Sequence, residues 1–278
     1  PSPKGTILPP TWHLAYFPSR VPESKLASDG YEQDWSPPFP HLHRMWASGE
    51  LSWNQRQPIK SRSRGYNAIF SSRHSNESKE ENAAIPFLFG SINICIIIRV
   101  DNADHPKETA STILPPSPSS PPSSPLPPPT TSPDFIINLK PTPVTLFRFS
   151  ALTFNSYLIH YDHIHSTTKE INVHNTYIMT GRLTHGPLSF TKMVNYLDKH
   201  LLALGANSGD SPRKKITNLS YPCFSPLVVN DPITVMGRQS GANERSLWVL
   251  DHEGNVAVKG SVVVEGERIR ERADSMAD

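Results

Sequence analysis

Residues 184–205 read THGPLSFTKMVNYLDKHLLALG, and this stretch determines the fold class. Its apolar residues recur at intervals of three and four, which predicts a single buried helical stripe made of Phe190, Met193, Val194, Leu197, Leu201 and Leu204. Pro187 suits the first turn of a helix, and Gly205 suits its C-terminal end. We therefore expect one long helix that buries one face.

Gly186 lies at the start of this helix, where the backbone N–H groups have no partner within the helix. Such an N–H points out of the positive end of the helix dipole and can polarise a carbonyl oxygen. Plain core packing accounts for the apolar stripe of the same helix, so the helix alone does not assign a function.

A second informative stretch lies upstream, at residues 146–162, and reads LFRFSALTFNSYLIHYD. The alternation of Leu146 and Arg148 with Phe147 and Phe149 predicts the end of a strand. Ser150 would then be the N-cap of a short helix.

Asn155 and His160 follow five residues apart on the expected helix-to-loop turn. An amide and an imidazole placed there can face one ligand together, and histidine is the side chain best suited to moving a proton near neutral pH. The ordinary alternative is a capping asparagine and a histidine satisfied within the core.

Four metal-ligating side chains also crowd into this region: His160, Asp162, His163 and His165. Metal sites use such clusters, but they usually take ligands from one face or from separate elements. On an extended strand His163 and His165 would point away from Asp162. We therefore expect no metal site.

The C-terminal part of the sequence indicates an antiparallel sheet. A polar loop is expected at 206–220, and strands are expected at Leu227–Val229, Ile233–Gly237, Ser246–Leu250 and Asn255–Glu265. Residues 251–254, DHEG, would join the last two strands as a hairpin turn. Several strands around one long helix predict an α+β fold in which the sheet wraps the helix.

The N-terminal part is less regular. Residues 1–60 are rich in proline and aromatic residues, which favours extended, packed loops, and residues 61–80 are polar and basic. Residues 85–100, IPFLFGSINICIIIRV, predict one or two buried strands and are too short to span a bilayer. We find no long amphipathic helix before residue 140.

Composition excludes several classes of function. The net charge of +2 and the 19% of charged residues give no electrostatic case for nucleic-acid binding. The two cysteines form no disulfide framework, and no cleavable signal peptide is visible. Many of the 29 prolines lie in residues 104–133, which predicts a disordered or polyproline II segment.

Residues 150–162, SALTFNSYLIHYD, together with 184–188, THGPL, resemble the MaoC-like hot-dog dehydratases. The resemblance is strongest to the fungal mitochondrial hydroxyacyl-thioester dehydratase type 2 family. Residues 9–53 and 221–266 are similar to the N-terminal signature and the C-terminal strands of that family. The resemblance implies a double hot-dog fold, here with an irregular N-terminal half.

On this basis we expect an N-terminal hot-dog-like half at 1–103, a Pro-rich linker at 104–135, a catalytic hot-dog domain at 136–268 and a frayed tail at 269–278. The resemblance fails over 61–135, where strands and a helix of the N-terminal repeat should lie. Our hypothesis for this region is aberrant sequence, such as translated intron, or a degenerate repeat.

The resemblance implies reversible dehydration of a (3R)-3-hydroxyacyl thioester to the trans-2-enoyl thioester, with no metal or nucleotide redox cofactor. His160 would take the proton next to the thioester carbonyl, and the Gly186 N–H would stabilise the enolate-like oxygen. Asn155 replaces the aspartate of bacterial (R)-specific enoyl-CoA hydratases; an amide can hold the water but cannot exchange a proton. Either His160 handles both proton steps, or Asp162 or a water assists.

The remaining residues that the resemblance assigns to substrate binding are Asp162, His185, Pro187 and Leu188. The substrate would be carried by acyl carrier protein or CoA, in fatty acid synthesis in the mitochondrial matrix. The alternatives are a hydratase of short CoA esters such as mesaconyl-CoA, and an inactive product with a disrupted N-terminal half. The expected assembly is a pseudo-dimer of two repeats, with a homodimer as the second possibility.

Overall fold

The computed structural model describes residues 8–33, 41–53, 69–73, 90–100, 126–168, 180–207 and 214–266. Only the backbone is described for 41–45, 47, 69–73, 90–100 and 207. Most of the predicted linker (residues 104–125) and the whole predicted tail (269–278) lie outside the described residues.

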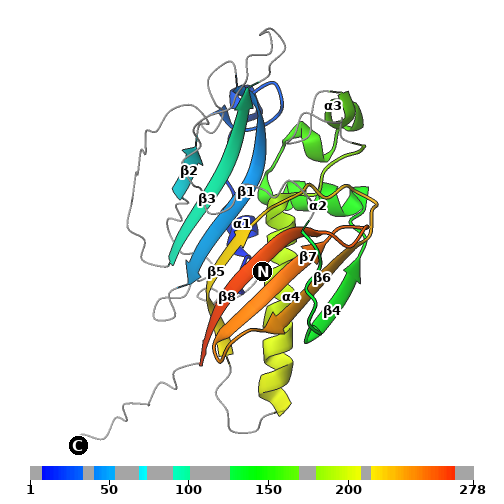
Figure 1. Cartoon of the computed structure of the whole chain (residues 1–278). Coiled ribbons are helices and arrows are strands. Elements are labelled where there is room, and N and C mark those ends of the chain that lie inside the picture. The colour runs from blue at the N-terminus through cyan, green and yellow to red at the C-terminus, as the bar shows by residue number, and fades with distance from the viewer. Residues whose placement is uncertain are drawn as a thin grey trace, which may run out of the picture.

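The described strands form one eight-stranded sheet in the order β2-β3-β1-β5-β8-β7-β6-β4 (Figure 1). The N-terminal half supplies β1 (His41–Trp53), β2 (Ile69–Arg73) and β3 (Gly90–Val100). The rest are β4 (Phe135–Leu139), β5 (Lys214–Pro222), β6 (Ile233–Gln239), β7 (Glu244–Leu250) and β8 (Val256–Gly266). All neighbouring strands are antiparallel except β2 and β3, and β1 joins the two halves by pairing with β5.

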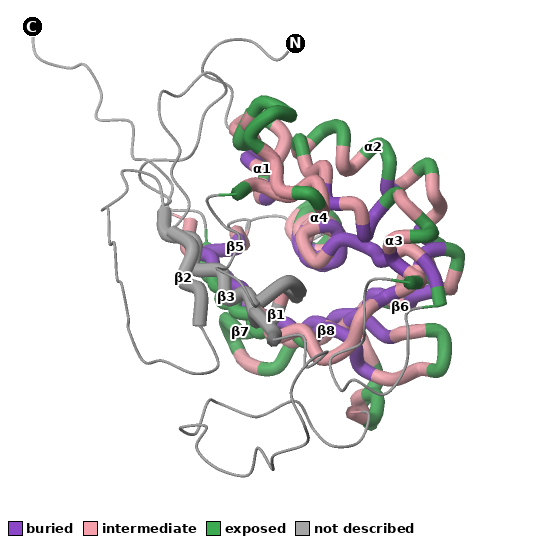
Figure 2. The backbone as a smooth tube through the Cα atoms, turned by 90° about the horizontal axis from the view of Figure 1, so that it is seen from above, coloured by how far each residue is buried: buried purple, intermediate pink, exposed green. Residues whose placement is uncertain are grey.

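One long helix, α4 (Gly186–Asn207), packs on a face of this sheet. The shorter helices are α1 (His13–Tyr16), η1 (Glu23–Lys25), α2 (Pro143–Thr153), η3 (Leu158–His160) and α3 (His163–Thr168). Seen from above in Figure 2, α4 lies between the sheet on one side and α1 and α2 on the other. The predicted α+β hot-dog arrangement is confirmed. None of the described helices is long and apolar enough to cross a membrane.

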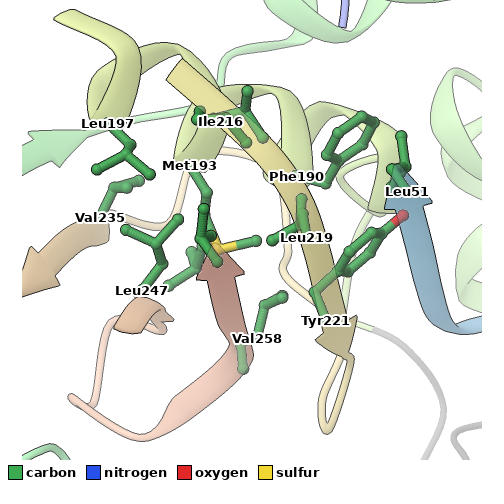
Figure 3. Packing of buried hydrophobic residues seen from close by; sticks show 14 of the residues in the cluster. Leu51, Phe190, Met193, Leu197, Ile216, Leu219, Tyr221, Val235, Leu247 and Val258 are labelled. Carbon is green, nitrogen blue, oxygen red and sulfur yellow. The ribbon is translucent and has the colours of Figure 1, made fainter. Parts of the chain in front are cut away.

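The predicted apolar stripe of α4 forms the centre of the core. Its residues pack on inward-facing side chains of β5 to β8 (Figure 3), and five of the six are buried: Phe190, Met193, Val194, Leu197 and Leu201. The prediction was wrong for Leu204, which is 47% exposed. Figure 1 shows the reason, because the last turn of α4 extends past the sheet.

The predicted strand end at 146–149 was also wrong, since these residues lie in helix α2. Thr142 is the N-cap: its side-chain oxygen accepts a hydrogen bond from the Thr145 N–H at 3.2 Å. Pro143 then occupies the first turn, where its missing N–H costs nothing. This Thr-Pro start overrides the short run of alternating residues and places Ser150 inside the helix.

The downstream strand predictions were mostly confirmed. β6, β7 and β8 match the expected strands, and Gly254 in the turn between β7 and β8 has a φ of +88° that favours glycine. The predicted loop at 206–220 was wrong from Lys214 onward, because β5 begins there and pairs with β1 and β8. Leu227–Val229 is a short bridge to Leu183 and not a full strand.

The N-terminal half is more regular than the sequence predicted. The apolar run contains β3, as expected, but β1 is a 13-residue strand where loops were expected, and β2 lies within the predicted polar loop. Among the described residues before 140, no α-helix is longer than the four residues of α1. These strands extend the sheet of the C-terminal half without a second long helix in the described residues.

Two neighbouring leucines of α4 test the packing of this helix. Leu201 is 2% exposed and Leu202 is 42% exposed. We expect Leu201→Ala to lower the free energy of unfolding by about 2–5 kcal/mol, because it leaves a cavity under the sheet. The matched Leu202→Ala should stay within about 0.5 kcal/mol. Urea unfolding measures both, and equal effects would contradict this placement of α4.

Candidate active site

The segment that leads into α4 is held from two sides. On one side, Thr184 N–H donates to the Leu227 carbonyl at 2.7 Å, and Val229 N–H donates to the Arg182 carbonyl at 2.9 Å. On the other side, Leu183 N–H donates to the Ile159 carbonyl at 3.0 Å. These backbone bonds fix the start of α4 against the turn that carries His160.

His160 lies at the end of η3 and is buried. Its Nδ1 is 2.8 Å from the Leu183 carbonyl oxygen. A carbonyl oxygen can only accept a hydrogen bond, so Nδ1 carries the proton and the lone pair of the neutral ring lies on Nε2. The ring is therefore oriented, with its basic nitrogen defined, as a general base requires.

The ring of His185 packs face to face on the ring of His160. The two imidazoles are stacked, with ring centroids 3.6 Å apart and an interplanar angle of 20°. His185 is completely buried, its Nε2 is 2.8 Å from the Ser150 hydroxyl, and its ring meets the edge of Phe149. Burial, and then the proximity of His160, lower the pKa of His185 far below its ordinary value, so this ring stays neutral.

Gly186 follows His185 and begins α4, so the stacked imidazoles lie beside the positive end of the helix. The N–H groups of Leu188 and Ser189 both donate to the His185 carbonyl. Thr184 Oγ1 and His185 Nδ1 are buried here without a hydrogen-bond partner among the described residues. A buried helix start with unsatisfied polar atoms is suited to a polar ligand group.

The other predicted site residues are placed differently. Asn155 is half-buried, and its Oδ1 accepts a hydrogen bond from the Tyr157 N–H at 3.1 Å. Asp162 Oδ1 accepts from the His165 N–H at 2.9 Å, so this carboxylate caps α3. Pro187 is half-buried, and Leu188 is buried in a small cluster with Leu146 and Val229. The structure thus brings His160, His185 and Gly186 together, whereas Asp162 and Leu188 have structural partners.

An N-terminal segment braces the turn that carries His160. Leu158 N–H donates to the Asp29 carbonyl at 2.8 Å, and the Ser156 hydroxyl donates to the Gly30 carbonyl at 2.5 Å. Gly30 has a φ of +80°, and a Cβ there would collide with the Ser156 carbonyl oxygen, so only glycine fits. Sequence reasoning missed this brace and also the contact from Ser150 to His185, because both join residues that are distant in the chain.

The histidines of the predicted metal alternative do not converge. His163 and His165 lie on helix α3, not on a strand, and His163 is exposed. Within the part of the chain that the structure describes, no group of three or more His, Cys, Asp or Glu side chains is arranged to hold a metal ion.

Comparison with known proteins gives a consistent set of similarities. A sequence model described as "Hydroxyacyl-thioester dehydratase type 2" matches residues 11–229, which is more than half of the chain. The chain is 26% identical over 269 residues to mesaconyl-C(4)-CoA hydratase of Chloroflexus aurantiacus, covering 93% of this chain and 84% of that protein. It is also 26% identical over 272 residues to the mitochondrial hydroxyacyl-thioester dehydratase type 2 of Schizosaccharomyces pombe, covering 88% and 81%.

Two solved structures are also similar. The MaoC-like dehydratase from Phytophthora capsici matches with a TM-score of 0.49 and 13% identity, covering 84% of this chain and 73% of that one. An (R)-hydratase from A. caviae matches with a TM-score of 0.36 and 17% identity, covering 49% of this chain and 97% of that one.

The buried His185 predicts a pH dependence of stability. Its pKa is lowered in the folded chain from 6.5, so below about pH 6.5 the unfolded chain binds more protons and the free energy of unfolding falls. One such proton contributes a slope of up to about 1.4 kcal/mol per pH unit. Urea unfolding between pH 7.5 and 5 should therefore show a shallower slope in His185→Gln than in the parent.

Burial also lowers the pKa of His13, to about 4. His13 contributes equally to the pH dependence of the parent, of His185→Gln and of the control variant. The control is His163→Gln, at an exposed imidazole of α3, which should keep the slope of the parent. A His185→Gln variant with the same slope as the parent would show that His185 is not held neutral.

Proposed function

Since the chain belongs to the hydroxyacyl-thioester dehydratase type 2 family and is therefore a hydratase or dehydratase, we propose that it interconverts (3R)-3-hydroxyacyl thioesters and trans-2-enoyl thioesters. The observation that carries the proposal is the position of the His160 ring. It is oriented by the Leu183 carbonyl and stacked on the residue that precedes the N-terminus of α4. A base beside a helix N-terminus is the pair of groups that removal of a proton next to a carbonyl requires.

In the proposed complex the thioester carbonyl oxygen accepts a hydrogen bond from the Gly186 N–H. This contact acidifies the protons on C2, because the negative charge that develops on the oxygen lies at the positive end of α4. His160 Nε2 removes the C2 proton. The hydrogen bond from Nδ1 to the Leu183 carbonyl stabilises the imidazolium that forms.

The hydroxyl on C3 then leaves as water. In a syn elimination the C2 proton and the C3 hydroxyl lie on the same side of the substrate, so one residue can reach both. The proton that Nε2 takes from C2 is returned to the departing hydroxyl, and the C2–H electron pair becomes the double bond. His160 ends in its original state, which balances the reaction without a carboxylate, metal or redox cofactor.

We assign Asn155 to holding the hydroxyl or water, since an amide can donate and accept hydrogen bonds but cannot exchange the proton. Its engagement with Tyr157 N–H leaves the side-chain NH₂ to make that contact. Because the Asp162 carboxylate caps α3, we favour His160 over Asp162 for both proton steps. His185 supports the His160 ring by stacking on its face, while Pro187 and Leu188 shape the start of α4.

The proposals for the acyl carrier and for the metabolic role of the reaction are supported by the two relatives. The Schizosaccharomyces pombe relative is named mitochondrial, which supports the proposal that this chain acts on acyl carrier protein or CoA thioesters in mitochondrial fatty acid synthesis. The Chloroflexus aurantiacus relative supports the second candidate, hydration of mesaconyl-CoA. We retain the pseudo-dimer of two repeats over a homodimer, because β1 of the N-terminal half pairs directly with β5. The same pairing argues against an inactive product.

The test of the base is hydration of crotonyl-CoA, followed by loss of the enoyl-thioester absorbance. We expect His160→Ala to lower kcat by about 10²-fold or more, because the only assigned proton acceptor is lost. The matched control is His163→Ala, at an exposed histidine three residues away, which should retain the parent rate. A folded His160→Ala variant with the rate of the parent would refute the assignment.

The two candidate substrates are separated by kcat/KM for a crotonyl thioester and for mesaconyl-CoA. Mesaconyl-CoA carries a free carboxylate that the crotonyl thioester lacks, and its charge must be paired when it is buried. For the fatty-acid function we expect the linear crotonyl thioester to be preferred by at least about tenfold, equivalent to about 1.4 kcal/mol. A preference for mesaconyl-CoA would establish the second candidate instead.

A further inference from the structure

Trp46 of strand β1 packs directly on Gly186, the first residue of α4. A Cβ built on Gly186 would lie 2.7 Å from Trp46 Cγ and 2.9 Å from Trp46 Cβ, closer than real side chains approach. An accessible N–H at the start of the helix is one reason for glycine at position 186. The structure adds a second reason, because only glycine leaves room for the indole.

Trp46 is itself held by Tyr221 of β5. The indole Nε1–H donates to the Tyr221 hydroxyl at 2.9 Å. Tyr221 is 1% exposed, and its ring is stacked on Phe190 of α4 with centroids 5.3 Å apart. Figure 3 shows Tyr221 and Phe190 together with Leu51 where β5, α4 and β1 meet.

Gly186 and Phe190 are four residues apart, so they lie on the same face of α4 one turn apart. Trp46 contacts the first of these residues, and Tyr221 stacks on the second. The two aromatic side chains are hydrogen-bonded to each other, so they hold the first turn of α4 as a unit. The position of the Gly186 N–H along and around the helix axis is thereby fixed.

An irregularity in β1 turns Trp46 toward this contact. Trp46 pairs with Ile96 and Ser48 pairs with Cys95, which is the next residue of β3. β1 therefore contains one extra residue here, Ala47, which is a β-bulge. In a regular strand Trp46 would share a face with Ser48 and not with Gly49.

Because of the bulge Trp46 lies on the core side together with Gly49, which meets the Tyr221 ring, and the buried Leu51. Bulges that redirect a side chain in this way are common next to active sites.

We infer that Trp46 is a positioning residue for the reaction. Through its contact with Gly186 and its hydrogen bond to Tyr221, Trp46 of the N-terminal half determines the position of the oxyanion-stabilising N–H of Gly186. This inference rests on the proposed function of Gly186. The ordinary alternative is that Trp46 only joins the two halves of the sheet. The two differ in what happens to kcat in protein that remains folded.

The experiment compares Trp46→Ala, Trp46→Phe and Tyr221→Phe in the full chain, with crotonyl-CoA as substrate. We expect kcat to fall by about tenfold or more in Trp46→Ala, since a small displacement of a catalytic group costs much of its effect. KM should change by less than about threefold, because the N–H acts mainly on the transition state. Trp46→Phe keeps a ring against Gly186 and should recover part of the lost kcat.

Trp46→Phe and Tyr221→Phe remove the same hydrogen bond from opposite ends. Their effects on kcat should therefore be similar, and the double variant should be no slower than either single variant. The control is Trp53→Ala, which truncates another partly buried indole of β1 that packs on the core. It should lower the melting temperature without lowering the kcat of the folded protein.

The inference is overturned if Trp46→Ala, or Trp46→Phe where the alanine variant does not fold, keeps the kcat of the parent. It is also overturned if Trp53→Ala lowers kcat as much as Trp46→Ala does. A parent chain without hydratase activity would instead refute the proposed function, so the two failures are distinguishable.

Discussion

The burial of one face of α4 against the sheet is the constraint on which the proposed site depends. Phe190, Met193 and Leu197 fix the helix on the strands, and its first residue, Gly186, is thereby fixed as well. The residue before it, His185, has no exposed surface and supports the ring of His160. The proposed base and a helix N-terminus thus lie together because a hydrophobic stripe determines where the helix begins.

The two halves of the chain contribute to this site in different ways. The C-terminal half provides His160, His185 and Gly186, whereas the N-terminal half provides contacts that hold them. Backbone carbonyls of Asp29 and Gly30 accept hydrogen bonds from the turn that carries His160, and Trp46 packs on Gly186. An irregular N-terminal half is therefore compatible with a complete site, provided that these few contacts are kept.

The sequence predicted the elements whose signals are local. The period of α4, the strands β6 to β8 and the turn at Gly254 follow from apolar spacing and turn chemistry. The first part of helix α2 was missed because the alternation at 146–149 was weighed above the Thr142 cap and Pro143. Strand β5 was missed because its exposed face is polar, which is also typical of a loop.

The site was predictable only in part. The spacing of Asn155 and His160 and the glycine before a helix are visible in the sequence, and family resemblance joined them. The support of His160 by Leu183, of His185 by Ser150 and of Gly186 by Trp46 joins residues up to 140 positions apart. No local pattern signals such contacts, and the β-bulge at Ala47 reverses the face that strand alternation assigns to Trp46.

The most direct test of the central claim is hydration of crotonyl-CoA in D₂O, with the product analysed by NMR and by chiral chromatography. A base at His160 that transfers a deuteron from the attacking D₂O adds one deuterium to C2, and the expected product is the (3R)-3-hydroxyacyl thioester. A (3S) product would contradict the proposed reaction. A folded chain that forms no hydroxyacyl thioester from CoA or acyl carrier protein substrates would contradict it as well.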